Sequence, residues 1–247
     1  MTKKEIIRQY IKKYKYFSLT QVVKDTKLEK KIVIDYLYQL KQGNIIFDAG
    51  RGIYSSIESV FQLVPESRVE TLIKHLKKDF PYTDFVIWNT RQLQPLYHHT
   101  QQHHITFVEV EKGSVSAFFE RIAKEYRETV TEKRNKSYYD SFDISHNPVV
   151  IRNLVSRSSR NGHVPRLEKV LVDMFVDMDK YKHISALDYW KVWKVLCSKY
   201  RINMGFIYNY SKRRKCFSDM FPQLIDLYIS YGIDLHHLLQ ESGKNLQ

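Results

Sequence analysis

The sequence predicts an α+β protein in which an N-terminal winged helix-turn-helix precedes a mixed α/β domain with a helical C-terminal part. Three observations lead to this fold class. Three short helical patterns are followed by two alternating segments around a glycine turn, apolar runs of strand character come next, and the end of the chain reads as helices. We expect a DNA-binding domain at residues 1–60 and a second domain at 66–247, helical from about 181, with the boundary near Pro65.

Apolar residues at helical spacing predict the three N-terminal helices. Ile6, Ile7, Tyr10, Ile11 and Tyr14 form the stripe of the first helix. The second follows Ser18 or Thr20, either of which can accept backbone hydrogen bonds at a helix start, and it buries Val22 and Val23. The third begins near Leu28 or Glu29, and its inner face is Val33, Tyr36, Leu37 and Leu40. Gly43 is expected to end it in the left-handed conformation.

The segment "NIIFDAGRGIYSS" predicts a β-hairpin, because its apolar residues alternate and Gly50 and Gly52 bracket Arg51 at a tight turn. Three short helices and a hairpin are the plan of a winged helix. In that plan the third helix enters the major groove and the hairpin tip reaches the neighbouring backbone or minor groove.

The charge of the chain favours a polyanionic partner. The 247 residues carry 40 Lys and Arg against 27 Asp and Glu, a net charge of +13. Residues 1–57 alone hold twelve Lys and Arg against five Asp and Glu, a net charge of +7. We therefore expect double-stranded DNA to contact the N-terminal domain. The predicted DNA-binding residues are Lys30, Lys31, Ile34, Tyr38, Lys41 and Arg51.

The remainder of the chain predicts a small mixed sheet flanked by helices. "DFVIWNT" and "HITFVEVEK" are strand-like, and the second is apolar on both faces, as a central strand would be. The clearest helix has an apolar stripe from Leu167 to Met178, with Arg166, Glu168, Lys169, Asp173 and Asp177 on its other side. No apolar run could span a membrane, no secretory leader is visible, and two cysteines make no disulfide framework, so we expect a cytoplasmic protein.

Three groups of residues have side chains that could form catalytic or metal sites, and none predicts an enzyme. His98, His99, His103 and His104 fit no zinc spacing. Glu109 and Glu111, with Asp84, could hold magnesium in a nuclease, but Lys112 follows Glu111 directly and the register is wrong, so salt bridges or helix caps are the better interpretation. Ser156, Ser158, Ser159 and His163 lack a glycine-flanked elbow. We expect no metal and no cofactor.

Taken in order along the chain, several motifs resemble the antitoxin component of AbiE-type abortive-infection systems, which are type IV toxin–antitoxin systems. Arg51, Gly52 and Tyr54 match an Arg-Gly-x-Tyr at the hairpin. A helix with Glu168, Lys169, Leu171 and Asp173 follows the sheet, although Lys169 stands where some relatives would have arginine. Tyr210, Arg213 and Arg214 match a late basic element.

The resemblance implies a bacterial cytoplasmic protein that represses its own promoter and neutralises a toxin resembling a nucleotidyltransferase. It could act as a dimer on paired sites. For the basic run Lys212, Arg213, Arg214 and Lys215, toxin contact, DNA backbone contact and simple solvation stay open. Two further hypotheses for the whole chain are a DNA nuclease targeted by its winged helix and a protein-interaction module. Core packing is the expected role of the helix at Leu171, with Asp173 capping it or pairing with an arginine.

Overall fold

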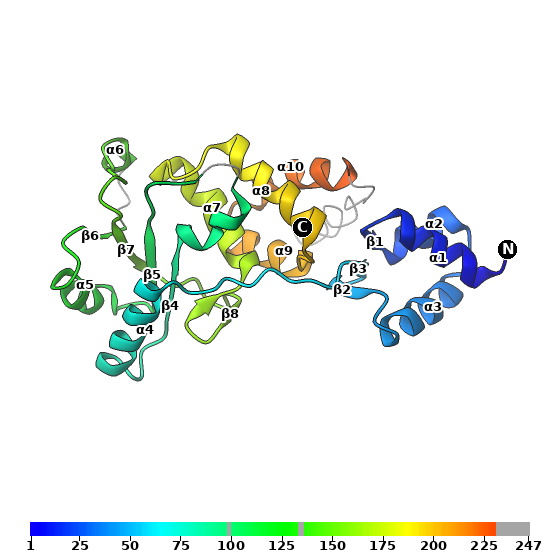
Figure 1. Cartoon of the computed structure of the whole chain (residues 1–247), viewed down its shortest axis with the longest axis horizontal. Helices are drawn as coiled ribbons and strands as arrows, with labels where there is room; N and C mark the ends of the chain where they lie inside the picture. The colour runs from blue at the N-terminus through cyan, green and yellow to red at the C-terminus, as the bar shows by residue number, and fades with distance from the viewer. Residues whose placement is uncertain (98–99, 133–135, 231–247) are drawn as a thin grey trace, which may run out of the picture. The chain divides into compact units, whose positions relative to one another are not determined.

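The computed structural model describes residues 1–97, 100–132 and 136–230 of the chain (Figure 1). Contacts divide the chain into two compact units. Unit 1 comprises Met1–Phe61 together with Lys194–Gln247, and unit 2 comprises Gln62–Trp193. The fold is α+β with a helical C-terminal part, which confirms the predicted class. Among the described residues, no helix is long and apolar enough to cross a membrane.

Unit 1 begins with three helices and a three-stranded antiparallel sheet. The elements are α1 (Lys3–Lys13), β1 (Tyr16–Ser18), α2 (Leu19–Thr26), α3 (Lys30–Gln42), β2 (Phe47–Gly50) and β3 (Ile53–Ser55). The sheet order is β1-β3-β2, so the predicted hairpin is present and β1 adds a strand that the sequence did not predict. The assignment of these elements to a DNA-binding winged helix stays a prediction.

The three helices close over an apolar core that the sequence stripes predicted. Ile7, Ile11, Val22, Val33, Leu37 and Leu40 are buried together with Phe17 and Ile46. Ser18 caps α2 by accepting a hydrogen bond from the Gln21 N–H at 3.1 Å, which confirms one of the two predicted caps. Gly43 does follow α3, but its φ of −83° is not left-handed. Asn44 takes the left-handed conformation instead, with φ of 53°, because asparagine tolerates that region better than most residues.

The C-terminal helices of unit 1 are tied to its first strand. Unit 1 contains the end of α8 (Ala186–Lys199), then α9 (Met204–Arg213) and α10 (Phe217–Ser230). The buried Tyr16 hydroxyl donates to the Tyr200 carbonyl at 2.6 Å and accepts from the Ile202 N–H at 3.0 Å. The Arg201 N–H donates to the Ser59 carbonyl at 2.7 Å.

The observed domain division differs from the predicted one. The sequence placed residues 66–247 in one domain, whereas the described residues from 194 to 230 group with the N-terminal unit and the division falls within α8. The physical reason is a set of long-range hydrogen bonds, between residues such as Tyr16 and Tyr200, that local periodicity does not encode. At the other boundary, the structural break after Phe61 lies close to the predicted one.

Unit 2 is built on a four-stranded mixed sheet. Its elements are α4 (Ser67–Asp79), β4 (Phe85–Asn89), the 3₁₀-helix η1 (Thr90–Leu96), β5 (Thr106–Val110), α5 (Val115–Ala123), β6 (Thr129–Thr131), α6 (Lys136–Asp140), β7 (Val149–Asn153), the short strands β8 (Arg160–Asn161) and β9 (Val164–Pro165), and α7 (Leu167–Tyr181). The strand order is β4-β5-β7-β6, with β4 antiparallel to β5 and the other pairs parallel. The prediction that "HITFVEVEK" supplies a central strand is confirmed, since β5 lies between β4 and β7.

The two faces of this sheet are chemically different. One face presents Phe85, Ile87, Val108, Val110 and Ile151 to apolar residues of α4 and α5. Side chains alternate along a strand, so Trp88, Phe107, Glu109 and Arg152 share the opposite face. There Glu109 and Arg152 bond to side chains of α7, which covers them.

Candidate nucleic-acid interface

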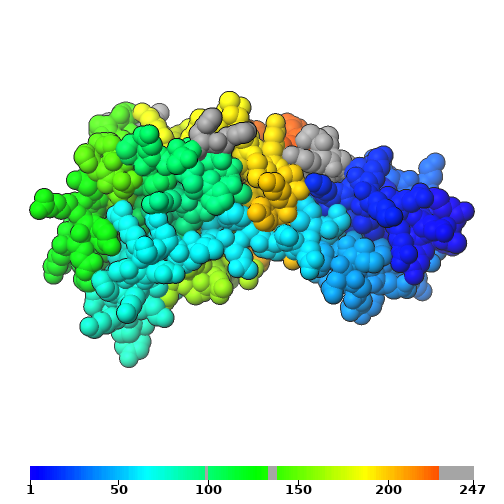
Figure 2. Space-filling view, viewed as in Figure 1, coloured from blue at the N-terminus to red at the C-terminus, as the bar shows by residue number. Residues whose placement is uncertain are grey.

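The helix α3 has one buried face and one exposed face that carries most of the predicted DNA-binding residues. Val33, Leu37 and Leu40 point into the core of unit 1. Lys30, Lys31, Ile34 and Tyr38 are exposed, and Ile34 and Tyr38 keep 44% and 62% of their surface in contact with solvent. The surface of α3 is visible in mid-blue in Figure 2. The structure therefore brings together on one side of the helix four of the six residues singled out from the sequence.

An exposed Ile–Tyr pair between lysines is an unusual helix surface. Most exposed helix positions in soluble proteins are polar, because apolar side chains gain free energy when they leave water. Here Ile34 and Tyr38 are four residues apart, so their side chains lie next to each other on the exposed face. Among the residues that the structure describes, neither Lys30 nor Lys31 forms an ion pair. The surface combines unneutralised positive charge with apolar contact area.

Lys41, the last of the predicted DNA-binding residues on α3, differs from the others because it forms an ion pair. Its Nζ lies 2.5 Å from Oδ2 of Asp48 on β2, and this hydrogen bond raises the pKa of Lys41. Both side chains are about half exposed. Lys41 therefore links α3 to the hairpin, and its charge is already partly neutralised.

The hairpin tip holds Arg51 in an exposed turn. Gly50 and Gly52 both have positive φ, of 142° and 70°, which a residue with a side chain adopts only with strain. The Gly52 carbonyl accepts a hydrogen bond from the Leu19 N–H at 2.9 Å, so the turn is fixed to the start of α2. Among the described residues Arg51 has no ion-pair partner. The predicted position of Arg51 at a turn tip is confirmed.

The turn is also packed against the first turn of α9. A Cβ atom built on Gly205 would lie 3.6 Å from the Gly50 Cα and 3.8 Å from the Arg51 backbone nitrogen. On the neighbouring segment, the Arg201 guanidinium stacks over the Phe47 ring at 4.6 Å. The C-terminal helices thus contact the hairpin directly, a contact that sequence reasoning did not find.

Most of the net charge belongs to unit 1. Its residues 1–61 and 194–247 hold twenty Lys and Arg against ten Asp and Glu, a net charge of +10. Unit 2 holds twenty against seventeen, a net charge of +3. The unit that contains α3 and the hairpin therefore carries +10 of the total net charge of +13, a larger share than the +7 of residues 1–57 alone.

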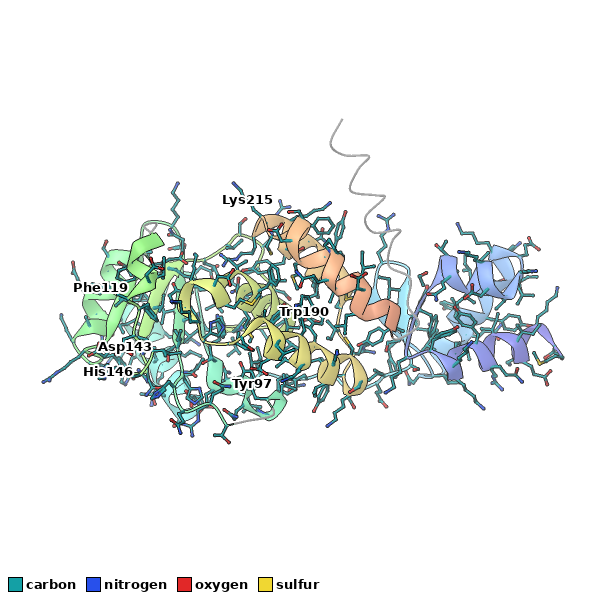
Figure 3. The ribbon with its side chains drawn as sticks, turned by 90° about the horizontal axis from the view of Figure 1, so that it is seen from above. Tyr97, Phe119, Asp143, His146, Trp190 and Lys215 are labelled. Atoms are coloured by element: carbon teal, nitrogen blue, oxygen red, sulfur yellow. The ribbon has the colours of Figure 1, made fainter. Side chains whose placement is uncertain are left out.

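The basic run at the end of α9 lies in unit 1 and is only partly free. Lys212 and Lys215 are exposed, and Lys215 (Figure 3) adopts a left-handed conformation at the turn before α10. Lys212 donates to the Tyr208 hydroxyl at 2.5 Å and lies over the Phe217 ring at 5.2 Å. Arg213 and Arg214 are half-buried. Two of the four side chains, Lys212 and Lys215, are thus fully at the surface.

Two of the three acidic residues considered for a nuclease, Glu109 and Asp84, are engaged in ion pairs. Glu109 is 1% exposed, and its oxygens accept from Lys169 Nζ at 2.6 and 2.7 Å, from Arg152 at 3.1 Å and from the Trp88 indole N–H at 3.1 Å. Burial by itself raises the pKa of Glu109, but the charges of Lys169 and Arg152 outweigh it and hold the pKa well below its usual value. This confirms the salt-bridge interpretation for Glu109. Asp84 pairs with Arg160, and Glu111 is exposed beyond the end of β5.

Glu109 belongs to a buried cluster of five charged side chains, Glu109, Arg152, Lys169, Asp173 and Asp177, each at most 2% exposed. Lys169 Nζ lies 2.5 Å from Asp173 Oδ2, and Arg152 lies 2.6 Å from Asp177 Oδ2 and 3.6 Å from Asp173 Oδ2. The expected pairing of Asp173 with an arginine is therefore confirmed. The polar side of α7 is buried like its apolar side. The only sequence signal was one charge within each of two apolar strand runs, Glu109 in "TFVEV" and Arg152 in "VVIRN".

The remaining candidate residues form no metal-binding group among the described residues, or they lie outside them. His98 and His99 are not among those residues. His104 is half-buried, and His163 stacks on Phe85 with its Nδ1 2.9 Å from the Phe85 carbonyl oxygen. Within residues 1–97, 100–132 and 136–230, no three His, Cys, Asp or Glu side chains gather as metal ligands would.

Comparison with known proteins identifies a family. The model of the family described as a family of unknown function (DUF6577) matches residues 32–228, which is most of the chain and includes α3 from its third residue, the hairpin, unit 2 and α9. Neither the curated proteins nor the solved structures gave a match. The chain belongs to the family of unknown function DUF6577.

Proposed function

We propose that the protein binds double-stranded DNA through unit 1, with α3 in the major groove and the hairpin tip at the adjacent backbone or minor groove. The observation that carries this proposal is the exposed face of α3, where Lys30, Lys31, Ile34 and Tyr38 lie opposite the core residues of the same helix. A recognition helix typically uses residues of its N-terminal half to contact base edges. Lys30, Lys31 and Ile34 are in that half of α3.

The chemistry of this face fits DNA. Lysines near the helix start suit phosphate oxygens or guanine acceptors, while Ile34 and the Tyr38 ring suit thymine methyl groups and sugars. Arg51 at the tip of the hairpin suits a phosphate or a narrow minor groove, which attracts arginine. The net charge of +10 on unit 1 supports the same polyanionic partner.

We further propose that the bound DNA is the protein's own promoter and that the protein is a cytoplasmic autorepressor and antitoxin for a nucleotidyltransferase-like toxin. The support is the resemblance to AbiE-type antitoxins at Arg51, Gly52 and Tyr54, at the α7 motif and at Tyr210, Arg213 and Arg214. In this proposal two copies bind paired sites in the promoter, and the exposed Lys212 and Lys215 contact either the toxin or the DNA backbone.

The test of DNA binding is fluorescence anisotropy with a labelled duplex from the promoter of the gene, competed by a scrambled duplex of equal length. Sequence-selective binding with an affinity that falls as salt rises supports the proposal. Equal competition by both duplexes contradicts the autorepression proposal but is consistent with DNA binding that is not sequence-specific. Absence of binding at low salt contradicts both, and a protein partner captured through Ile34 and Tyr38 would then be the better function for this face.

The antitoxin proposal has its own test. The protein is co-expressed with the product of the neighbouring gene, if that product is nucleotidyltransferase-like, and growth and co-purification are measured. Restored growth together with a stable complex supports the proposal. If the toxin stays toxic when this protein is in excess, the antitoxin proposal is contradicted, and the DNA-binding proposal is unaffected.

A further inference from the structure

Unit 2 contains a polar cavity of about 390 Å³ at the edge of its sheet where β4 ends and β5 and β7 begin. Its wall comes from the start of α4, the end of β4, the segment before β5 and the loop before β7. The residues used below are Arg68, Asn89, Arg91, Gln101, His104 and Asn147. Asp143 and His146, labelled in Figure 3, belong to the loop that leads to Asn147.

Arg68 brings a positive charge that no carboxylate neutralises within the described part of the chain. Its guanidinium lies over the Tyr126 ring at 4.8 Å, which holds the plane of the group in place. One terminal nitrogen donates to the Asn147 carbonyl over a long 3.4 Å, and the buried Nε has no hydrogen-bond partner among the described residues. The buried Nε is out of reach of a ligand, so an oxyanion would bind to the terminal nitrogens of this oriented guanidinium.

Arg91 adds a second positive charge to the cavity wall, and His104 adds a polar ring. Arg91 is 65% exposed, and its Nε lies 3.8 Å from Glu66 Oε2, a loose contact. The His104 backbone N–H donates to Asn147 Oδ1 at 2.8 Å, while its ring Nδ1 is buried without a hydrogen-bond partner among the described residues. Burial and then the charge of Arg91 lower the pKa of His104. The lining thus carries two guanidinium groups, Arg68 and Arg91, against one carboxylate, Glu66, which leaves a net positive charge that favours an anion.

The start of α4 contributes to the same wall. This helix of thirteen residues begins at Ser67, and its N-cap Glu66 makes no side-chain capping bond. The first backbone N–H groups of a helix have no partner within it, and they point along the positive end of the helix dipole. Ser67 and Arg68 are therefore placed where helix N-termini bind phosphate groups in other proteins.

The rest of the lining is rich in amides. Gln94, Gln101, Gln102 and Asn147 line the cavity, with no large apolar side chain among the lining residues. Asn89 also lines it, but its amide groups already bond the Thr106 hydroxyl and the Arg91 N–H. Amide groups offer both donors and acceptors, which suits hydroxyl groups better than aliphatic ones. The volume lies near the lower end of the range for sites of small organic ligands.

We propose that this cavity binds a small phosphomonoester with a hydroxylated body, the chemistry shared by sugar phosphates and nucleoside monophosphates. The phosphate group is bound by Arg68, Arg91 and the start of α4, and the amide side chains contact the hydroxyl groups. The site consists of residues of unit 2, so this proposal does not rest on the proposal that unit 1 binds DNA.

The experiment is isothermal titration calorimetry of the full chain with three probes: ribose 5-phosphate, adenosine 5′-monophosphate and inorganic phosphate. The variants are Arg68→Gln and Arg91→Gln, and the matched control is the exposed Arg127→Gln of the same unit, which does not line the cavity. We expect at least one phosphomonoester to bind more tightly than inorganic phosphate. Each cavity variant should weaken it by about tenfold or more, because a charge-assisted hydrogen bond is lost.

Arg91→Gln keeps the proposal testable if Arg68→Gln does not fold, since Arg91 is exposed. A second readout is the NMR titration of the His104 ring, whose pKa should rise when the ligand is bound. The proposal is overturned if none of the probes binds at millimolar concentration, if inorganic phosphate binds as well as the esters, or if Arg127→Gln weakens binding as much as Arg91→Gln. Preference for the sugar phosphate or for the nucleotide identifies the body of the ligand.

Discussion

Gly50 and Gly205 approach each other so closely that a Cβ atom on Gly50 would lie 2.9 Å from the backbone nitrogen of Gly205. Real Cβ contacts are essentially never that short, so either a backbone shift or a loss of the contact must follow if Gly50 acquires a side chain. The contact joins the hairpin to the first turn of α9. The tip residue Arg51 is therefore held next to the first turn of α9.

Gly50→Ala should therefore destabilise unit 1 more than Gly52→Ala. Both substitutions place an L side chain at positive φ, which costs about 1–2 kcal/mol, but only at Gly50 does the new methyl group also meet backbone atoms. We expect a loss of about 1 kcal/mol for Gly52→Ala and at least twice that for Gly50→Ala in urea unfolding. Equal losses would show that the hairpin does not depend on α9.

Tyr16→Phe should lower the free energy of unfolding by about 1–3 kcal/mol, because the buried hydroxyl bonds both the Tyr200 carbonyl and the Ile202 N–H. Without it, a buried donor and a buried acceptor lose a partner. Tyr38→Phe is the control, since that ring is exposed. If both variants unfold at the same denaturant concentration, the C-terminal segment is not held to unit 1 in the way the hydrogen bonds indicate.

Glu109→Gln should destabilise the protein by about 3–5 kcal/mol, because it leaves Lys169 and Arg152 buried with less compensating charge. Glu111→Gln, two residues away and exposed, should have almost no effect. Because the pKa of Glu109 is lower in the folded chain than in the unfolded one, its contribution is present above about pH 4.3 and is lost as the pH falls below it. The check is chemical denaturation of both variants from pH 7 to pH 3.

His183 should make the free energy of unfolding depend on pH at higher pH values than Glu109 does. Burial, and then the charge of Arg152, lower the pKa of His183 to about 4. In the unfolded chain the ring takes up a proton near pH 6.5, so stability is full above that pH and falls progressively toward pH 4, by up to about 3 kcal/mol. His183→Phe should flatten this part of the pH profile, and the exposed His146→Gln should leave it unchanged. A slope that survives His183→Phe would assign the effect to other groups.

The parts of the fold that depend on local sequence could be predicted. The stripe Val33, Leu37 and Leu40 gave the buried side of α3 and hence its exposed side, and Gly50 and Gly52 gave the turn that presents Arg51. The parts that depend on distant segments could not. Nothing near Tyr16 indicates Tyr200, and nothing in α7 shows that Lys169 and Asp173 face the strand charges of Glu109 and Arg152 rather than water.

The division of the chain was missed for the same reason. A helical pattern from residue 181 onward shows where helices form but not which core they join. The pairing of Lys41 with Asp48 was also outside reach, because it depends on how β2 lies beside α3. These residues modify the candidate interface: Lys41 is partly neutralised, and Gly205 supports the tip.

The most direct measurement is the affinity for promoter DNA as a function of salt, for the wild-type chain and for a variant with Lys30→Glu, Lys31→Glu and Arg51→Glu. The matched control reverses three exposed lysines of unit 2, Lys74→Glu, Lys77→Glu and Lys78→Glu. We expect the unit 1 variant to lose at least about tenfold in affinity and its salt dependence to become shallower by about 0.9 per lost phosphate contact, while the control stays close to wild type. Equal affinities and equal salt slopes in the two variants would contradict DNA binding through α3 and the hairpin.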